Sequence, residues 1–325
     1  MPANLTPDYL AAERKWKEAK TPQDKLAALQ EMLATVPKHK GTDKMQADIK
    51  RRIAKARDAL QHKKGAARQK PFYHVDKEGA GQIVLAGSPN SGKSSLLRAL
   101  TRAEPEVADY PFTTRVPLPG MVPFENIQVQ LLDLPPLSQE LTEGWVYGII
   151  RGADAALIVV DLADDEALAQ TQTVLDLLAA ARISLRRTGE RNGQHVTPAV
   201  FICTKIDRPN ARERLAAFEE LFGARLPVLP VSVATGENLE ALRRRLFDLL
   251  EVIRVYSKPP GRKADLTAPF ILKRGSNVMD AAETIHKDFA ERFRYARLWG
   301  RDTYSGQMVS RGHALEDGDV IELHA

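Results

Sequence analysis

The chain has 325 residues, of which 43% are hydrophobic and 27% are charged, and its net charge is +5. These values exclude wholesale disorder and leave room for two or three packed domains. The longest apolar run is too short to cross a bilayer, no signal peptide is recognised, and a single cysteine excludes an internal disulfide framework. We therefore expect a cytoplasmic protein.

Positive charge is concentrated at the N-terminus. Residues 1–70 hold 17 Lys/Arg against 8 Asp/Glu, so the rest of the chain is slightly acidic. Such a segment favours a polyanion, and RNA is the commonest polyanion of the cytoplasm. The alternative is a solvated basic region without a partner. Capping signals at Thr6-Pro7 and Thr21-Pro22, followed by apolar residues at helical spacing, predict that 1–70 is helical and ends in a linker.

Short apolar runs alternate with helical patterns over residues 81–256. The predicted strands are 82–86, 127–132, 155–160, 199–203 and 228–231, and the predicted helices start at Lys93, Ala167, Ala211 and Asn238. This alternation predicts an α/β domain, doubly wound, with a mostly parallel sheet covered on both faces.

A Pro- and Gly-containing linker at 257–261 precedes the last segment. Residues 264–325 are predicted to contain a strand at 270–272, a helix from about 277 to 292, and short strands separated by glycines. This pattern predicts a small α+β module at the C-terminus.

The residues after the first predicted strand match the phosphate-binding pattern G-x-x-x-x-G-K-[ST] in full. Glycines let such a loop wrap closely around phosphate oxygens, and its amides donate to their negative charge. Lys93 is expected to bridge the β- and γ-phosphates, and the Ser94 hydroxyl to bind Mg²⁺. The predicted phosphate-binding residues are Gly87, Ser88, Pro89, Asn90, Ser91, Gly92, Lys93, Ser94 and Ser95.

A second motif predicts guanine as the base. Thr204, Lys205 and Asp207 follow an apolar strand and are similar to the Asn/Thr-Lys-x-Asp signature of GTPases. The Asp207 carboxylate can accept from the N1 and N2 hydrogens of guanine, a pair of donors that adenine lacks. Lys205 would lie along the base, and Thr204 fills a place more often held by Asn. The loop expected to contact the guanine oxygen consists of Ser232, Val233 and Ala234.

Two more positions are predicted to serve Mg²⁺. Asp133 ends an apolar strand, where a carboxylate near the metal is expected. Residues 110–114 lie where the first switch loop belongs, and we expect Thr114, rather than Thr113, to bind Mg²⁺ once the γ-phosphate is present. Lys93 and Thr114 are therefore the predicted catalytic residues.

These motifs resemble the Obg-like branch of translation-factor-related GTPases, and most closely the developmentally regulated GTP-binding proteins. The segments that carry the resemblance are 38–42, 106–114, 130–135 and 151–154. Residues 281–289, 296–300 and 315–320 resemble a TGS domain, a ubiquitin-like β-grasp module. The resemblance implies a GTP- and GDP-binding protein with slow Mg²⁺-dependent hydrolysis and a ribosome- or RNA-associated role in translation. We expect a monomer.

The resemblance also suggests a bound K⁺ ion. Potassium-dependent relatives have an asparagine at the fourth residue of the phosphate-binding motif, and Asn90 occupies that place. The alternative is an asparagine that only forms a turn.

One departure from the family pattern concerns the γ-phosphate. The usual Asp-x-x-Gly is replaced at 133–136, where Pro136 lacks the N–H that normally contacts this phosphate. Leu137 follows, where Ras-like proteins have a water-positioning glutamine. Two functions therefore stay open. One is a slow GTPase, which we favour because hydrolysis needs mainly phosphate positioning and cations. The other is a non-hydrolysing nucleotide-binding module that docks on RNA or the ribosome through the basic N-terminal segment and the TGS domain.

Overall fold

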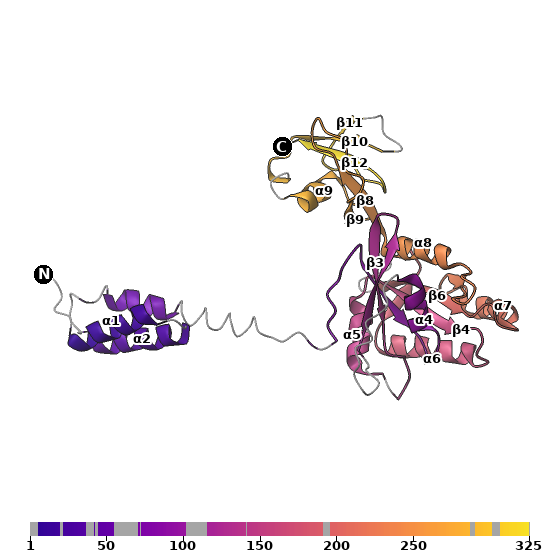
Figure 1. The fold of residues 1–325 in the computed structure, drawn as a ribbon, viewed down its shortest axis with the longest axis horizontal. Coiled ribbons are helices and arrows are strands. Elements are labelled where there is room, and N and C mark those ends of the chain that lie inside the picture. Colours follow the sequence, from indigo (N-terminus) through magenta and orange to yellow (C-terminus); the bar gives the residue numbers. More distant parts are fainter. Residues whose placement is uncertain are drawn as a thin grey trace. The chain divides into compact units, whose positions relative to one another are not determined.

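The computed structural model describes residues 6–19, 22–36, 42, 45–54, 71, 73–101, 116–140, 142–190, 196–286, 290–300 and 306–324. The chain divides into two compact units, Met1–Pro71 and Phe72–Ala325 (Figure 1). Within the described ranges, no helix combines the length and the apolar character that a membrane span requires.

Helical segments build the first unit, as predicted. They are α1 (Pro7–Glu18), α2 (Pro22–Thr35) and residues 45–54. The hydroxyl of Thr6 caps α1 by accepting from the Tyr9 amide at 3.3 Å, and it donates to the Thr35 carbonyl at 3.1 Å. The apolar core of this unit contains Tyr9, Ala12, Leu29, Met32, Val36, Ile49 and Ile53.

A sheet of seven described strands forms the centre of the second unit. Its order is β2-β3-β1-β4-β6-β5, with β7 also paired to β6, and only the β2–β3 hairpin is antiparallel. The strands are β1 (Gln82–Ala86), β2 (Leu118–Phe124), β3 (Ile127–Asp133), β4 (Ala155–Asp161), β5 (Ser184–Arg186), β6 (Val196–Thr204) and β7 (Val228–Pro230).

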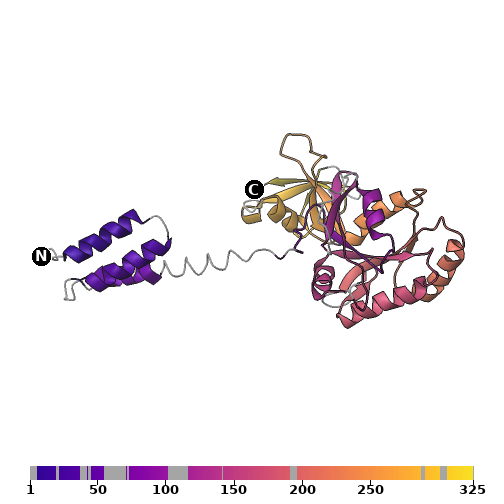
Figure 2. The ribbon, with the colours of Figure 1, turned by 60° about the horizontal axis from the view of Figure 1, so that its bottom comes forward.

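Helices cover both faces of this sheet (Figures 1 and 2). One face carries α4 (Lys93–Leu100) and α8 (Leu239–Leu250), and the other carries α5 (Gly144–Gly152), α6 (Ala167–Ala180) and α7 (Ala211–Phe222). Successive residues of β1 serve the two cores in turn, since Ile83 faces α4 and Val84 faces the other layer. A strand buried on both sides is typical of a parallel sheet, and the predicted α/β fold is confirmed.

A second sheet occupies the C-terminal part, in the order β11-β10-β12-β8-β9. One of its faces packs on α9 (Val278–Ile285), which begins with a capping box between Asn277 and Asp280. The strands are β8 (Val252–Ser257), β9 (Phe270–Lys273), β10 (Tyr295–Trp299), β11 (Gln307–Val309) and β12 (Val320–His324).

Two boundaries differ from the sequence prediction. Residues 252–257 form β8, which pairs with β9 and β12 and so belongs to the C-terminal sheet rather than to the 81–256 domain. The chain reverses between α8 and β8 at Glu251, which has a left-handed φ of 51°, without any linker-like composition. The helix expected over 277–292 is interrupted: α9 ends at Ile285, where His286 is extended, and residues 290–291 are helical again after 287–289, which lie outside the described residues.

Candidate nucleotide-binding site

The predicted phosphate-binding loop joins β1 to α4. Gly92 immediately precedes α4 with a left-handed φ of 94°, and Asn90 is left-handed as well, with φ 59°. A Cβ at Gly87 would lie 2.4 Å from the Val159 carbonyl oxygen, so only glycine fits there. The Ser91 hydroxyl donates to the Ser88 carbonyl at 2.9 Å. The loop therefore has the tight, internally bonded shape that a phosphate cradle requires.

Lys93 is buried inside this loop, with 6% of its surface exposed. Its Nζ donates to the carbonyls of Gly87 at 3.2 Å and Ser88 at 2.7 Å, and to the Ser91 hydroxyl at 3.3 Å. Burial lowers the pKa of Lys93 from 10.5 to about 8. The hydrogen-bond acceptors of this buried ammonium are neutral, so a bound phosphate would give it an oppositely charged partner.

Ser94 and Asp133 meet at the end of β3. The Ser94 hydroxyl donates to Asp133 Oδ2 at 2.5 Å, whereas Asp133 Oδ1 is buried and has no hydrogen-bond partner among the described residues. Burial raises the pKa of Asp133, although the Ser94 hydrogen bond and the charge of Lys93 oppose this shift. An unpaired buried carboxylate oxygen beside a serine hydroxyl suits a hard divalent cation, so these residues fit Mg²⁺.

Thr204 connects the predicted guanine motif to the phosphate loop. Its hydroxyl is buried and lies 2.9 Å from the Ser91 carbonyl and 3.0 Å from the Val160 carbonyl. Its side chain also lies 3.4 Å from the point where a Cβ on Gly92 would stand. The threonine found where asparagine is commoner therefore still supplies the hydrogen bond that fixes the two loops together.

Ser232 positions Asp207. The Ser232 hydroxyl is fully buried, donates to Asp207 Oδ1 at 2.6 Å and accepts from the Thr235 amide at 3.1 Å. The Ser232 hydrogen bond holds the pKa of Asp207 below its usual range. Val233 and Ala234 continue the same loop and are more exposed than Ser232. The carboxylate is thus ionised and oriented, as an acceptor for two N–H groups must be.

Asp161 was missed by the sequence analysis. It ends β4 and accepts from the Lys205 ammonium at 2.5 Å through Oδ2 and from the Ala163 amide at 2.8 Å through Oδ1. Lys205 itself has a left-handed φ of 61°, which turns the chain at the end of β6. A carboxylate ending a buried strand was the available signal, but its partner lies 44 positions away in the sequence.

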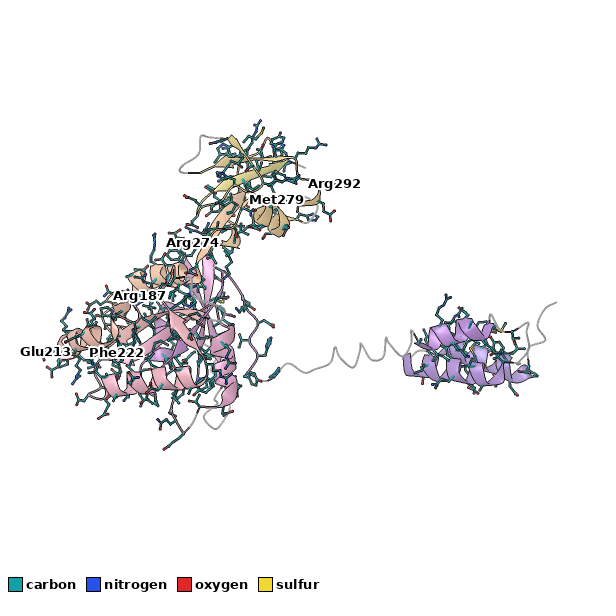
Figure 3. The ribbon with its side chains drawn as sticks, turned by 180° about the vertical axis from the view of Figure 1, so that it is seen from behind. Arg187, Glu213, Phe222, Arg274, Met279 and Arg292 are labelled. Carbon is teal, nitrogen blue, oxygen red and sulfur yellow. The ribbon has the colours of Figure 1, made fainter. Side chains whose placement is uncertain are left out.

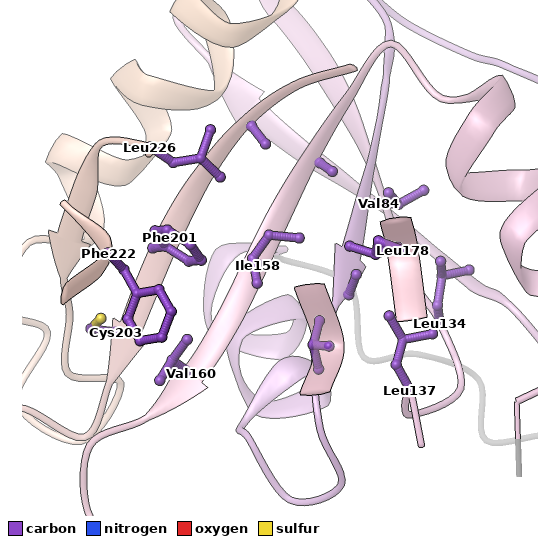
Figure 4. Close-up of a cluster of buried hydrophobic side chains, with 14 of the residues drawn as sticks. Val84, Leu134, Leu137, Ile158, Val160, Leu178, Phe201, Cys203, Phe222 and Leu226 are labelled. Carbon is purple, nitrogen blue, oxygen red and sulfur yellow. The ribbon is translucent and has the colours of Figure 1, made fainter. Parts of the chain in front are cut away.

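The segment after Asp133 is held against the core. Leu134 and Leu137 are buried beside Val84 and Leu178, in the cluster shown in Figure 4. The Leu137 amide donates to the Gly87 carbonyl at 2.9 Å, next to the phosphate loop. The side chain of Leu137 therefore faces the apolar core.

The predicted site residues converge because parallel strands end at the same edge of a sheet. Asp133, Thr204 and Asp161 end β3, β6 and β4, and the phosphate loop follows β1 between them. Pro89, Asn90 and Ser95 lie on the exposed side of the loop and of α4. Thr113 and Thr114 fall outside the described residues, so the metal role expected of Thr114 stays a prediction.

Comparisons with known proteins give matches for two parts of the chain. Residues 82–187 match a family described as 50S ribosome-binding GTPase, and residues 253–325 match the TGS domain. The chain is 28% identical to a GTP-binding protein of Methanocaldococcus jannaschii, with 93% of this chain and 92% of the relative covered. It is 28% identical to developmentally-regulated GTP-binding protein 1 of Xenopus laevis, with 92% and 98% covered.

A third relative, ribosome-interacting GTPase 1 of Saccharomyces cerevisiae, is 26% identical, with 93% of this chain and 99% of the relative covered. The resemblance predicted from the sequence is thereby confirmed. The TGS match begins at residue 253, in the strand that the structure adds to the C-terminal sheet. The chain is thus a GTP-binding protein that is similar to developmentally regulated GTP-binding proteins over nine-tenths of its length, with one region similar to the 50S ribosome-binding GTPase family and another similar to the TGS domain.

Proposed function

We propose that this protein is a slow, Mg²⁺-dependent GTPase that works on ribosomes or RNA in the cytoplasm. The observation that carries the proposal is the convergence of Lys93, the Ser94–Asp133 pair and the Ser232–Asp207 pair at one edge of the sheet. These groups suit the phosphates, the metal and the base of GTP, respectively. Guanine recognition and phosphate binding would thus use residues at one edge of the same sheet.

The residues of the site would contribute mainly by positioning and by charge. Lys93 would exchange its carbonyl acceptors for phosphate oxygens, which stabilise its charge better. Asp133 and Ser94 would hold Mg²⁺, which neutralises negative charge on the phosphates during transfer. Asp207 would fix the base through two hydrogen bonds. Electrostatic positioning of this kind can support slow hydrolysis without a dedicated base.

A second function, nucleotide binding without hydrolysis, is favoured by the segment after Asp133. Pro135 and Pro136 have no N–H to offer a γ-phosphate, and the next amide, that of Leu137, is already bonded to Gly87. A sensor for the third phosphate would then be missing at this position. In that case GDP and GTP would bind alike, and the protein would act as a nucleotide-stabilised docking module.

The two functions separate in a binding and turnover experiment. Fluorescent GDP and a non-hydrolysable GTP analogue are titrated into the full chain with Mg²⁺, in K⁺ and then in Na⁺, followed by single-turnover hydrolysis. Measurable GTP turnover supports the GTPase, and its absence in both salts supports the docking module. The variant Pro136→Gly restores the missing N–H, so we expect it to bind the triphosphate analogue more tightly than the wild type does.

The same titration tests the K⁺ ion expected at Asn90. If Asn90 helps to hold K⁺, turnover should be faster in K⁺ than in Na⁺, and Asn90→Asp should change that ratio. If Asn90 only forms the turn that its φ of 59° indicates, Asn90→Gly should leave hydrolysis and its salt preference unchanged, because glycine adopts this conformation easily.

Ribosome or RNA binding is proposed for the basic N-terminal region. The described helical segments of this region are nearly neutral, with seven Lys/Arg and six Asp/Glu. The excess charge of 1–70 therefore comes mainly from 37–44 and 55–70, which hold nine Lys/Arg and two Asp/Glu. We expect these segments, rather than the described helical segments, to carry the phosphate contacts.

Two triple variants test this assignment in ribosome co-sedimentation and RNA binding at several salt concentrations. The first variant replaces Lys63, Lys64 and Arg68 by uncharged residues. The matched control variant replaces Lys15, Lys17 and Arg51 in the same way. Each lost phosphate contact should reduce the slope of log K against log salt by roughly 0.7–0.9, so the first variant should lose roughly 2–3 if all three side chains contact phosphates. Equal losses in both variants would contradict the assignment.

A further inference from the structure

A cavity of about 720 Å³ lies at the edge of the GTPase sheet where β4 and β6 begin. These strands run parallel to β1, so the phosphate loop, which follows β1, lies at the opposite edge. Lys273 and Arg274, at the end of β9, line the cavity from the TGS sheet, and Figure 3 shows Arg274 where the two sheets meet. Volumes of roughly 300–1,000 Å³ are typical of sites for small molecules.

Two carboxylates of this cavity are already paired within the protein. Glu251 accepts from both terminal nitrogens of the Arg186 guanidinium, at 2.9 and 2.5 Å. The hydrogen bonds from Arg186 lower the pKa of Glu251 to about 2. Asp154 accepts from the Lys77 ammonium and from the Gln82 amide, both at 2.9 Å. Neither carboxylate therefore requires a cation from a ligand.

Three cationic side chains of the cavity lack a close carboxylate partner among the described residues. Arg274 makes no side-chain hydrogen bond or ion pair with them. Arg151 donates to a neutral acceptor, the Ala181 carbonyl, at 3.1 Å. Lys273 lies 3.9 Å from Asp154 Oδ1, too far for a hydrogen bond. All three side chains are exposed, so their charges are available to a ligand.

The balance of charge around the cavity is positive. The described lining residues include four Lys/Arg and three Asp/Glu, and Lys77 adds a fifth cation through its pair with Asp154. The third carboxylate, Glu190, is exposed and accepts from the Arg187 amide at 3.2 Å. Thr197 also lines the cavity, is only 7% exposed, and has a hydroxyl without a hydrogen-bond partner in the described part of the chain. An unpaired buried hydroxyl is costly, and an anion would accept from it.

We propose that this cavity binds a small sugar or polyol that carries two phosphate groups. Arg151 and Lys273 would contact one phosphate on the Asp154 side of the cavity, and Arg274 would contact the other. Phosphate suits these groups because its oxygens accept several charge-assisted hydrogen bonds at once. The Thr197 hydroxyl would donate to the same ligand.

The uncharged part of the lining favours an aliphatic frame over a nucleobase. Ala153, Val196, Pro198 and Leu250 provide apolar surface, and no aromatic side chain lines the cavity among the described residues. Unpaired bases are commonly held by stacking on aromatic rings, which this lining does not offer. The inference goes beyond the proposed function and does not depend on it, because the bisphosphate and GDP would bind at opposite edges of the sheet.

The test is isothermal titration calorimetry on the full chain, with the nucleotide site saturated with GDP and Mg²⁺. The ligand is fructose 1,6-bisphosphate, and fructose and citrate serve as a neutral sugar and an anion without phosphate. We expect one bisphosphate per chain, no binding of fructose and weaker binding of citrate. The double variant Lys273→Ala with Arg274→Ala should bind the bisphosphate roughly 10-fold or more weakly, because a lost hydrogen bond to a charged group costs at least that factor. Thr197→Val should weaken it as well.

The matched control is the double variant Arg262→Ala with Lys263→Ala. These residues are a second consecutive pair of exposed cations in the C-terminal part of the chain, and they do not line the cavity. The control should bind the bisphosphate like the wild type. Unchanged GDP affinity shows that each variant is folded.

Three results would overturn the assignment. The first is a wild type that binds no bisphosphate at about 1 mM, the weak end of specific affinities. The second is equal affinity of the wild type, the cavity variant and the control, which would mean that the ligand binds elsewhere. The third is a short unstructured RNA that displaces the bisphosphate and itself loses affinity in the cavity variant, which would make the cavity part of an RNA site. Failure of the wild type to bind GDP would instead contradict the proposed function.

Discussion

Replacing Thr204 by valine should separate the phosphate loop from the guanine loop. Valine has nearly the same shape, so the change creates no cavity and removes only the hydroxyl that lies 2.9 Å from the Ser91 carbonyl and 3.0 Å from the Val160 carbonyl. Because Thr204 is only 2% exposed, water cannot replace the lost donor. Leaving buried acceptors unpaired costs about 1–3 kcal/mol of unfolding free energy.

This cost can be measured in two ways. For a domain of this size, 1 kcal/mol corresponds to roughly 2–4 °C in melting temperature, so the GTPase domain of Thr204→Val should melt about 2–12 °C lower. Ser91 lies within the phosphate loop, so a looser loop should also bind GDP more weakly. A loss of about 1.4 kcal/mol there would raise the Kd for GDP tenfold. Urea unfolding with and without GDP gives both quantities.

Two controls make the result specific. Thr204→Ser keeps the hydroxyl, so its GDP affinity should stay near the wild-type value. Thr173→Val removes a hydroxyl that donates to the Ala169 carbonyl on the exposed side of α6, where water can take its place. That control should change the unfolding free energy by less than about 0.5 kcal/mol. If Thr204→Val were as mild as Thr173→Val, the bridge between the loops would have no energetic weight and the reasoning would be refuted.

Three other substitutions have signs that follow from the structure. Asp133→Asn should abolish the Mg²⁺ dependence of nucleotide binding. Because burial raises the pKa of Asp133, the stability of the metal-free wild type should fall as pH rises through that raised value. Thermal melts at several pH values should show that Asp133→Asn lacks this fall and is more stable than the wild type at neutral pH. Because the pKa of Lys93 is lowered, the folded nucleotide-free chain binds fewer protons than the unfolded chain between pH 8 and 10.5. The unfolding free energy of the wild type should therefore rise over that range, by up to about 3 kcal/mol more than that of Lys93→Met. Urea titrations measure both. Arg254→Met removes ion pairs to Glu125 and Asp317, and because both carboxylates are partly exposed the chain should lose only about 1–2 kcal/mol in the same assay.

The sequence predicts those strands that are buried on both sides. β1, β4 and β6 are almost continuous apolar runs, and no helical period competes with them. β2 was missed because Pro119, Gly120 and Pro123 argue against a strand. It forms nonetheless, because it lies at the edge of the sheet and pairs only with β3, so the absent N–H groups of the prolines need no second neighbour.

The candidate site is predictable where a local motif fixes the backbone. The phosphate loop and the guanine motif each occupy a few consecutive residues, and their spacing carries the chemistry. Asp161 and the bond between the Leu137 amide and the Gly87 carbonyl depend on which strands are neighbours, and local sequence does not contain that information. The same holds for β8, because its own residues do not show that its partner strands are β9 and β12.

The buried segment after Asp133 limits how this protein could report its nucleotide. Leu134 and Leu137 would have to leave the core before this segment could rearrange, and two prolines restrict its backbone.

The β2–β3 hairpin offers another route, because it links the region of the predicted first switch loop to Asp133 and its turn contacts Arg254 and Tyr256 of the TGS sheet. Coupling between two sites is reciprocal, so a nucleotide that shifts the hairpin must be bound differently when the TGS contact is cut. Arg254→Met therefore probes communication as well as stability: a changed ratio of GDP to GTP-analogue affinity would place the route in the hairpin, and an unchanged ratio would leave the two domains energetically independent.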